Sequence, residues 1–231
     1  MKKKAIIVAV IFIIATAGVA FNAIFQGGTN EEENKVEVRV EGTSIIYDGP
    51  MADEGVKKVK ELYTKDISRL VLNSAGGEIN IGMDLADFVY EKGLDVEIKS
   101  IAFSSAANYV FTAGKYKYLH KDSMVGWHGG VTQDNSKNFF MNLFMQKYLK
   151  EGKERETKFF EKIGVDQQST VYGLRPEFDK FTEKDGYVGW TYSLKAMDQL
   201  GIKNIVLLDK EWTPAPEYNG KKIFTIDQIQ K

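Results

Sequence analysis

The stretch from Arg69 to Gly77 decides the fold, and it reads Arg-Leu-Val-Leu-Asn-Ser-Ala-Gly-Gly. Its short apolar run predicts a buried strand that ends at the glycine pair. Apolar residues then recur at helical spacing through 79–90, up to Gly93. These three pieces predict a strand, a glycine turn and a helix.

The same pattern returns twice further along the chain. Residues 95–103 predict a second strand that runs into Ser104-Ser105, followed by a helix over 106–113. A third predicted strand, 124–127, ends at His128-Gly129-Gly130. Strands that alternate with helices in this way predict an α/β domain with a mainly parallel sheet and flanking helices.

Parallel order has a consequence for chemistry, because the carboxyl ends of parallel strands share one edge of the sheet. Ligands bind in the crevice beyond that edge. The three predicted strands end at Gly76-Gly77, Ser105 and His128. Glycine N–H groups can bind an oxyanion, a serine at a helix start can act as a nucleophile, and an imidazole can take its proton.

Outside these units, residues 36–40 and 45–47 predict two short strands, and the spacing from Val56 to Tyr63 predicts a helix. A longer helix is predicted from Phe139 to about Phe160, and its apolar part is broad. That helix is interpreted either as a core helix or as one that projects toward a second subunit. The second interpretation predicts a homo-oligomer.

The N-terminus predicts a membrane segment. Lys2, Lys3 and Lys4 precede an apolar run that extends from Ala5 to Phe25 with one interruption at Asn22, and a glutamate run follows. We expect an uncleaved anchor with the rest of the chain extracytoplasmic, by the positive-inside rule. The alternative is a signal peptide cleaved after Gly18-Val19-Ala20, which would release a secreted protein.

The predicted organisation has five parts. They are a basic cytoplasmic segment at 1–4, the anchor or signal peptide at 5–25, a stalk at 26–34, one domain at 35–210 and a C-terminal tail at 211–231.

Composition excludes several classes of protein. The chain has 231 residues, 31 Lys+Arg, 32 Asp+Glu and no cysteine. A near-neutral balance argues against a nucleic-acid partner, and the missing cysteine excludes disulfides, thiolate metal sites and a thiol nucleophile. Of its two histidines, His120 is interpreted as structural, so we expect no metal and no cofactor.

Three motifs together resemble the Clp-fold serine peptidases, a group within the crotonase-like superfamily. They are 72–79 with its Gly-Gly turn, 102–107 leading to Thr112-Ala113-Gly114, and Val125-Gly126-Trp127-His128. The resemblance spans about 36–208 and is strongest between 70 and 130. It implies the Clp/crotonase-like fold and peptide-bond hydrolysis, without metal or nucleotide.

Carried over by position, the resemblance implies that Ser105 is the nucleophile and His128 the general base, with Ser104 the less favoured serine. It places the oxyanion hole at the N–H groups of Gly77, Gly76 and Ala106. The segment from Thr182 to Asp185 looks like the family's acid-bearing segment, so Asp185 is expected to orient the imidazole. The longer stretch from Asp185 to Gly201 departs from the family pattern, and Asp179 remains an alternative.

Two functions follow as hypotheses. The first is a membrane-anchored, extracytoplasmic serine peptidase that acts on peptide or protein substrates. The second is a catalytically silent module of the same fold that binds peptides or acyl groups in the crevice. The presence of both Ser105 and His128 favours the peptidase.

Overall fold

The nine-residue strand β4 (Asp95–Phe103) organises the main sheet. The computed structural model describes residues 35–131, 139–183, 185–218 and 220–230. The other strands of this sheet are β1 (Glu37–Glu41), β2 (Ser44–Asp48), β3 (Arg69–Ser74), β5 (Lys117–Leu119), β6 (Met124–Gly126) and β8 (Ile205–Leu207). They run in the order β1-β2-β3-β4-β5-β8, with β6 paired to the second half of β4. Only the β1–β2 pair is antiparallel among these, so the prediction of a mainly parallel α/β sheet is confirmed.

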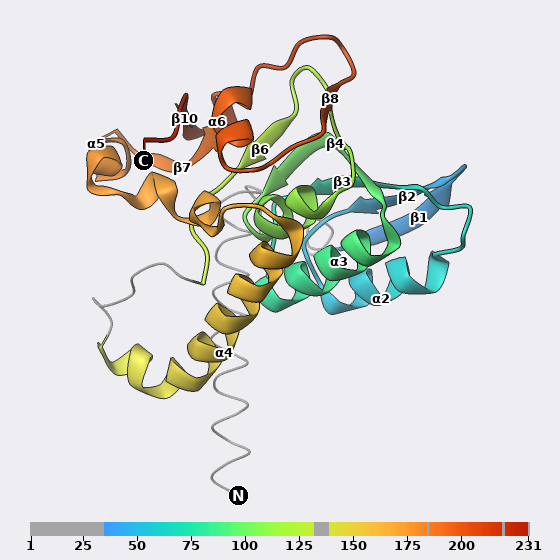
Figure 1. Ribbon diagram of the computed structural model, residues 1–231, viewed down its shortest axis with the longest axis horizontal. Coiled ribbons are helices and arrows are strands. Elements are labelled where there is room, and N and C mark those ends of the chain that lie inside the picture. Colours follow the sequence, from blue (N-terminus) through green and yellow to red (C-terminus); the bar gives the residue numbers. More distant parts are fainter. Residues whose placement is uncertain (1–34, 132–138, 184, 219, 231) are drawn as a thin grey trace, which may run out of the picture.

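Helices α2 and α3 lie against one face of this sheet, and the C-terminal part of α4 lies beside α3 (Figure 1). The described helices are α2 (Asp53–Leu62), α3 (Ile79–Lys92), the π-helical segment η1 (Ala106–Phe111), α4 (Phe139–Ile163), α5 (Asp179–Glu183) and α6 (Leu194–Gln199). Three short 3-10 turns lie between α4 and α5: η2 (Gln167–Thr170), η3 (Tyr172–Leu174) and η4 (Pro176–Phe178).

The core forms between the sheet and these helices. Alternate residues of neighbouring strands, such as Ile45, Leu70 and Val96, stand in register and are fully buried. They pack with apolar residues of α2 and α3, including Val59 and Val89. Buried residues recur every two positions in the strands and every 3.6 positions in the helices. Because these periods differ, the sequence pattern predicted both kinds of element.

A second, three-stranded sheet has the order β7-β10-β9. Its strands are β7 (Tyr187–Tyr192), β9 (Glu217–Tyr218) and β10 (Lys221–Ile226), and β10 runs parallel to β7. The segment 211–231, expected to be a tail, therefore contributes two strands to the fold. Ile223, Phe224 and Ile226 are buried there. The apolar pattern of these few residues is too short to predict the strand with which they pair.

The predicted anchor and stalk, residues 1–34, lie outside the described residues. Within the described ranges, no helix has both the length and the apolar character to cross a membrane. The predicted long helix after residue 139 is present as α4.

Candidate functional site

Parallel pairing brings the ends of β4 and β6 together. Phe103 stands beside Gly126 in the register, and the Ser104 N–H donates to the Gly126 carbonyl at 3.1 Å. Ser104 is the first residue past β4, and His128 lies two residues past β6. The two side chains therefore come from neighbouring strand ends, at the edge where the sequence predicted a site.

Ser104 and His128 form the central contact of this site. The distance from His128 Nε2 to Ser104 Oγ is 2.8 Å. Ser104 has a φ of +57°, a left-handed conformation that costs a non-glycine residue free energy. Its residue surface is 7% exposed, so a narrow part of it faces solvent. A serine within hydrogen-bond distance of an imidazole is the pairing that a serine nucleophile requires for activation.

The surroundings of His128 keep its ring neutral. The imidazole stacks on the Phe103 ring, with centroids 5.5 Å apart and planes 5° from parallel. Desolvation by the surrounding protein lowers the pKa of His128 to about 4, from the usual 6.5. In the tautomer protonated at Nδ1, Nε2 accepts a hydrogen bond from the Ser104 hydroxyl, which is the ground-state arrangement of a general base.

Ser105 occupies a different environment from the one the resemblance implied. It is fully buried, and its Oγ accepts a hydrogen bond from the Gly77 N–H at 3.0 Å. Helix α3 covers it, because a Cβ built on Gly82 would come within 2.7 Å of the Ser105 Cβ. The structure thus pairs His128 with Ser104 and places Ser105 beneath α3.

The physical reason for this difference is the turn at residue 104. A left-handed residue directly after β4 redirects the chain, so adjacent serines point to different sides. Motif register alone cannot separate two adjacent serines, and the conformation that separates them is unusual for a residue with a Cβ. The Ser-Ser dipeptide itself was the only indication in the sequence that a second serine could contact His128.

The expected oxyanion donors are only partly free. The Gly77 N–H is used by Ser105, and the Gly76 N–H donates to Ser74 Oγ at 3.1 Å. The first intrahelical bond runs from the Asn108 N–H to the Ser104 carbonyl at 2.7 Å, so the amides of Ser105 and Ala106 precede it. Amides of a first helical turn have no acceptor within the helix, and these two are the nearest candidates along the chain to Ser104.

Gly76 still has a structural role beside the nucleophile candidate. Its φ is +92°, and a Cβ at this position would come within 2.5 Å of the Phe103 carbonyl and 2.6 Å of the Ser104 Cβ. Only glycine allows the turn after β3 to approach the end of β4 this closely.

The backbone around His128 is held on both sides. Trp127 exchanges two backbone hydrogen bonds of 2.8 Å with Trp190 of β7. On the other side, Asn108 Nδ2 donates to the Gly129 carbonyl at 2.8 Å. These bonds fix the segment that carries the imidazole to β7 and to η1.

Glu156 of α4 is a residue that sequence reasoning missed. Its fully buried carboxylate accepts from the Tyr109 hydroxyl at 2.7 Å, the Val131 N–H at 3.3 Å and Gln167 Nε2 at 3.0 Å. A Cβ on Gly130 would lie 2.8 Å from the same carboxylate. The sequence places this glutamate on the apolar side of a predicted helix, near two phenylalanines. That position indicates a buried carboxylate, but it does not show which groups would donate hydrogen bonds to it.

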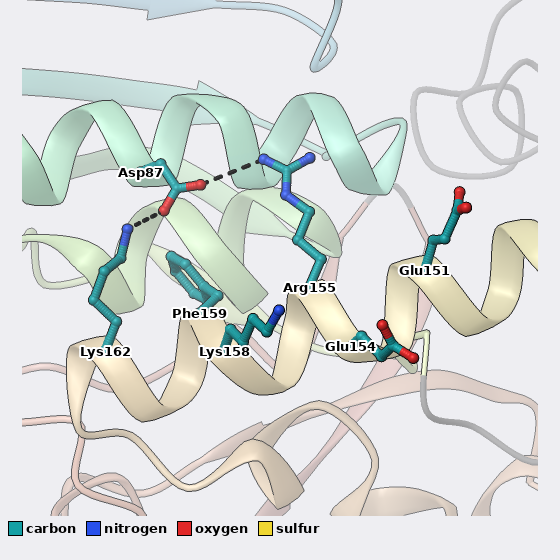
Figure 2. A pocket seen from close by; sticks show the side chains of 7 residues that line it. All are labelled: Asp87, Glu151, Glu154, Arg155, Lys158, Phe159 and Lys162. Carbon is teal, nitrogen blue, oxygen red and sulfur yellow. Dashed lines mark hydrogen bonds and ion pairs between the residues drawn. The ribbon is translucent and has the colours of Figure 1, made fainter.

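Ion pairs attach α4 to α3 along an open groove of about 410 Å³ (Figure 2). Arg155 donates to Asp84 at 2.6 Å, and both Arg155 and Lys162 reach Asp87. These charges pair with one another across the two helices. These ion pairs therefore help to position α4 and, through it, Glu156.

The expected acid stays a prediction. Asp179 begins α5, and Asp185 lies in the turn before β7; both side chains are exposed. An acid that orients a partly buried imidazole is usually itself shielded. His128 contacts Ser104 through Nε2 and stacks on Phe103.

His120 lies away from this site, at the end of β5. Its Nε2 is 3.0 Å from Glu97 Oε1, and Arg69 donates to the other oxygen of the same carboxylate at 2.7 Å. This surface cluster agrees with the structural interpretation of His120. The described residues contain no group of three or more acids or histidines arranged to hold a metal ion.

Comparisons with protein-family models and with curated proteins find no match to this chain.

Proposed function

We propose that this protein is a serine hydrolase of the peptidase type, with Ser104 as the nucleophile and His128 as the general base. The observation that supports it most directly is the 2.8 Å contact between His128 Nε2 and Ser104 Oγ. The mainly parallel α/β sheet, with this pair at its carboxyl edge, is compatible with a Clp/crotonase-like fold. The proposal keeps the predicted chemistry and moves the nucleophile by one residue, from Ser105 to Ser104.

The chemistry would proceed by acyl transfer. As Ser104 Oγ bonds to the carbonyl carbon of the substrate, its proton passes to Nε2 of His128. The imidazolium then donates that proton to the leaving amine, and the C–N bond breaks. Water attacks the resulting ester with His128 again as base, which releases the acid and restores the serine.

The first turn of the helix after Ser104 would stabilise the developing negative charge. For Ser104, the residue after the nucleophile is Ser105, and its N–H replaces that of Ala106 as the first donor. Gly77 would contribute only if its N–H moved from Ser105 Oγ to the oxyanion, a change that substrate would have to induce.

The cellular setting is part of the proposal. The lysines and apolar run before residue 26 support a membrane anchor with the catalytic domain extracytoplasmic. Fractionation tests this setting. Mature protein that begins near Phe21 in the soluble extracytoplasmic fraction would contradict the anchor and support a cleaved signal peptide.

A catalytically silent binding module is the second candidate. The observation that favours it is the partial occupation of the expected oxyanion donors, Gly76 and Gly77, by Ser74 and Ser105. A module of this kind would bind peptides or acyl groups without reacting with them. Covalent labelling separates the two candidates.

Labelling of the purified protein with a fluorophosphonate tests the proposal. We expect one covalent adduct per chain, found on the peptide that contains Ser104, because the probe reacts with serines activated by a base. Heat-denatured protein is the control and should not react. Intact native protein that remains unlabelled under conditions that label a known serine hydrolase would support the silent module instead.

The pH dependence of labelling is a separate prediction. Because His128 has a pKa of about 4, its neutral form predominates above that pH, and we expect the labelling rate to reach half its maximum near pH 4. A base with an ordinary pKa would give half the maximum near about 6.5. A rate profile from pH 3.5 to 8 distinguishes the two values, and a midpoint above 6 would contradict the burial effect.

The same shift predicts how stability changes with pH. Between about pH 4 and 6.5 the unfolded chain binds more protons at this residue than the folded chain does. The contribution of His128 to the free energy of unfolding therefore rises with pH through that window.

A further inference from the structure

A second pocket, of about 340 Å³, lies at the opposite edge of the sheet from Ser104. It is lined where helices end: by Gly93 after α3, by Gly114 after the helix that begins at η1, by Gly164 after α4 and by Gly201 after α6. The first residue of β5, Lys117, also lines it. Because Lys117 starts its strand and Ser104 follows the end of one, this pocket is separate from the candidate active site.

Lys117 is unusual because it is a buried cation. Its residue is only 4% exposed, and its ammonium donates to the Gly114 carbonyl at 2.7 Å. That carbonyl satisfies one of three ammonium protons, and the described residues supply no other acceptor. Desolvation by burial lowers the pKa of Lys117 to about 8.

The pocket lining has positive charge without a matching carboxylate. Lys115 and Lys203 line it together with Lys117, and none of the described lining residues is an aspartate or glutamate. Lys203 pairs with Asp198 at 2.5 Å, but Asp198 is not part of the lining. Carbonyls at the helix ends offer partial negative charge, which falls short of a counter-ion for a buried ammonium.

Part of the remaining wall is apolar. Ala113, Ile163 and Val165 form this part, and Ala113 and Val165 are buried, while Tyr90, Thr112 and Asn204 add polar groups to the lining. The volume is at the lower end of the range for small-molecule sites. A ligand that uses both features is small, carries a negative charge for Lys117 and presents a short hydrocarbon part to Ala113, Ile163 and Val165.

We propose that this pocket binds a small organic carboxylate, whose carboxylate group pairs with Lys117 and whose hydrocarbon part contacts Ala113, Ile163 and Val165. The ligand would supply the counter-charge that the described lining lacks. This site is independent of the hydrolase chemistry, and its test does not depend on activity.

The test measures the melting temperature of the purified protein with butyrate, phosphate or chloride at constant ionic strength. At a hundredfold excess over Kd, butyrate should raise the melting temperature by about 5 °C or more. Phosphate and chloride should not, because neither has an apolar part. Equal shifts with all three anions, or no saturable shift with butyrate, would overturn the proposal.

Variants identify the side chain responsible. Lys117→Met should abolish the butyrate effect, while Lys99→Met, at an exposed position in β4, should retain it. If Lys117→Met does not fold, NMR of labelled lysines in the natural protein replaces it. There the pKa of Lys117 should rise above its starting value of about 8 as butyrate binds; an unchanged pKa at saturation would contradict the pairing.

Discussion

Replacing Ser104 by alanine is expected to lower kcat/KM by about 10⁴-fold or more and to abolish fluorophosphonate labelling. The substitution removes the hydroxyl whose Oγ lies 2.8 Å from His128 Nε2, and no other group is left to form the acyl intermediate. The effect on stability should be small, about 1 kcal/mol or less, since one oxygen is lost and the backbone strain remains. Labelling, peptide hydrolysis and chemical unfolding of the variant measure these effects.

The matched control is Ser105→Ala. This change removes the acceptor of the Gly77 N–H and leaves the Ser104–His128 pair intact. We expect labelling to persist, with a loss of stability of about 1 kcal/mol from the half-buried amide left without its acceptor. If Ser105→Ala abolishes labelling and Ser104→Ala retains it, the nucleophile is Ser105, as the family resemblance implied.

Replacing Glu156 by alanine is expected to reduce the free energy of unfolding by about 3 kcal/mol or more. The variant leaves two buried donors, from Tyr109 and Val131, and one half-buried donor, from Gln167, without their shared acceptor. Val131 follows the segment that carries His128, so the imidazole also loses part of its support. Activity should fall by about 10²-fold at temperatures where the variant is still folded.

The conservative variant Glu156→Gln separates position from charge. Its amide oxygen can still accept from Tyr109 and Val131, while its NH₂ group meets the NH₂ group of Gln167 unless that side chain flips. We expect most of the activity and about half of the lost stability to be recovered. Chemical unfolding and kcat/KM, measured on both variants, check this. Unchanged stability in Glu156→Ala would show that the buried network contributes little.

Local patterns of apolar residues were sufficient to predict the central sheet and its helices. The apolar strand runs that end at Gly76-Gly77, Ser105 and His128, and the helical spacing between them, predicted a mainly parallel sheet, and the structure confirms it. Backbone periodicity and the right-handed crossover rule act locally, so they can be recognised without knowing the partners of each strand. The prediction that one sheet edge collects serine, histidine and glycines has the same origin.

The later part of the chain was harder to predict because its pairing is between distant segments. Strand β7 attaches to the end of β6 through the Trp127–Trp190 bonds, and β10 joins β7 from the region expected to be a tail. Neither pairing follows from spacing within either segment. Long-range pairing depends on which surfaces remain exposed after the first sheet has formed.

By itself, the sequence determined the alternation of strands and helices, the sheet edge that carries the candidate site and the identity of His128 as its base candidate. The tertiary structure decided which of two adjacent serines meets that base. The choice depends on the left-handed turn at Ser104 and on the close approach of Gly82 in α3, which buries Ser105. It also decided the partners of Glu156 and the counter-ion deficit at Lys117. Such contacts join residues far apart in the chain, and the spacing of residues in the sequence does not show which of them meet in space.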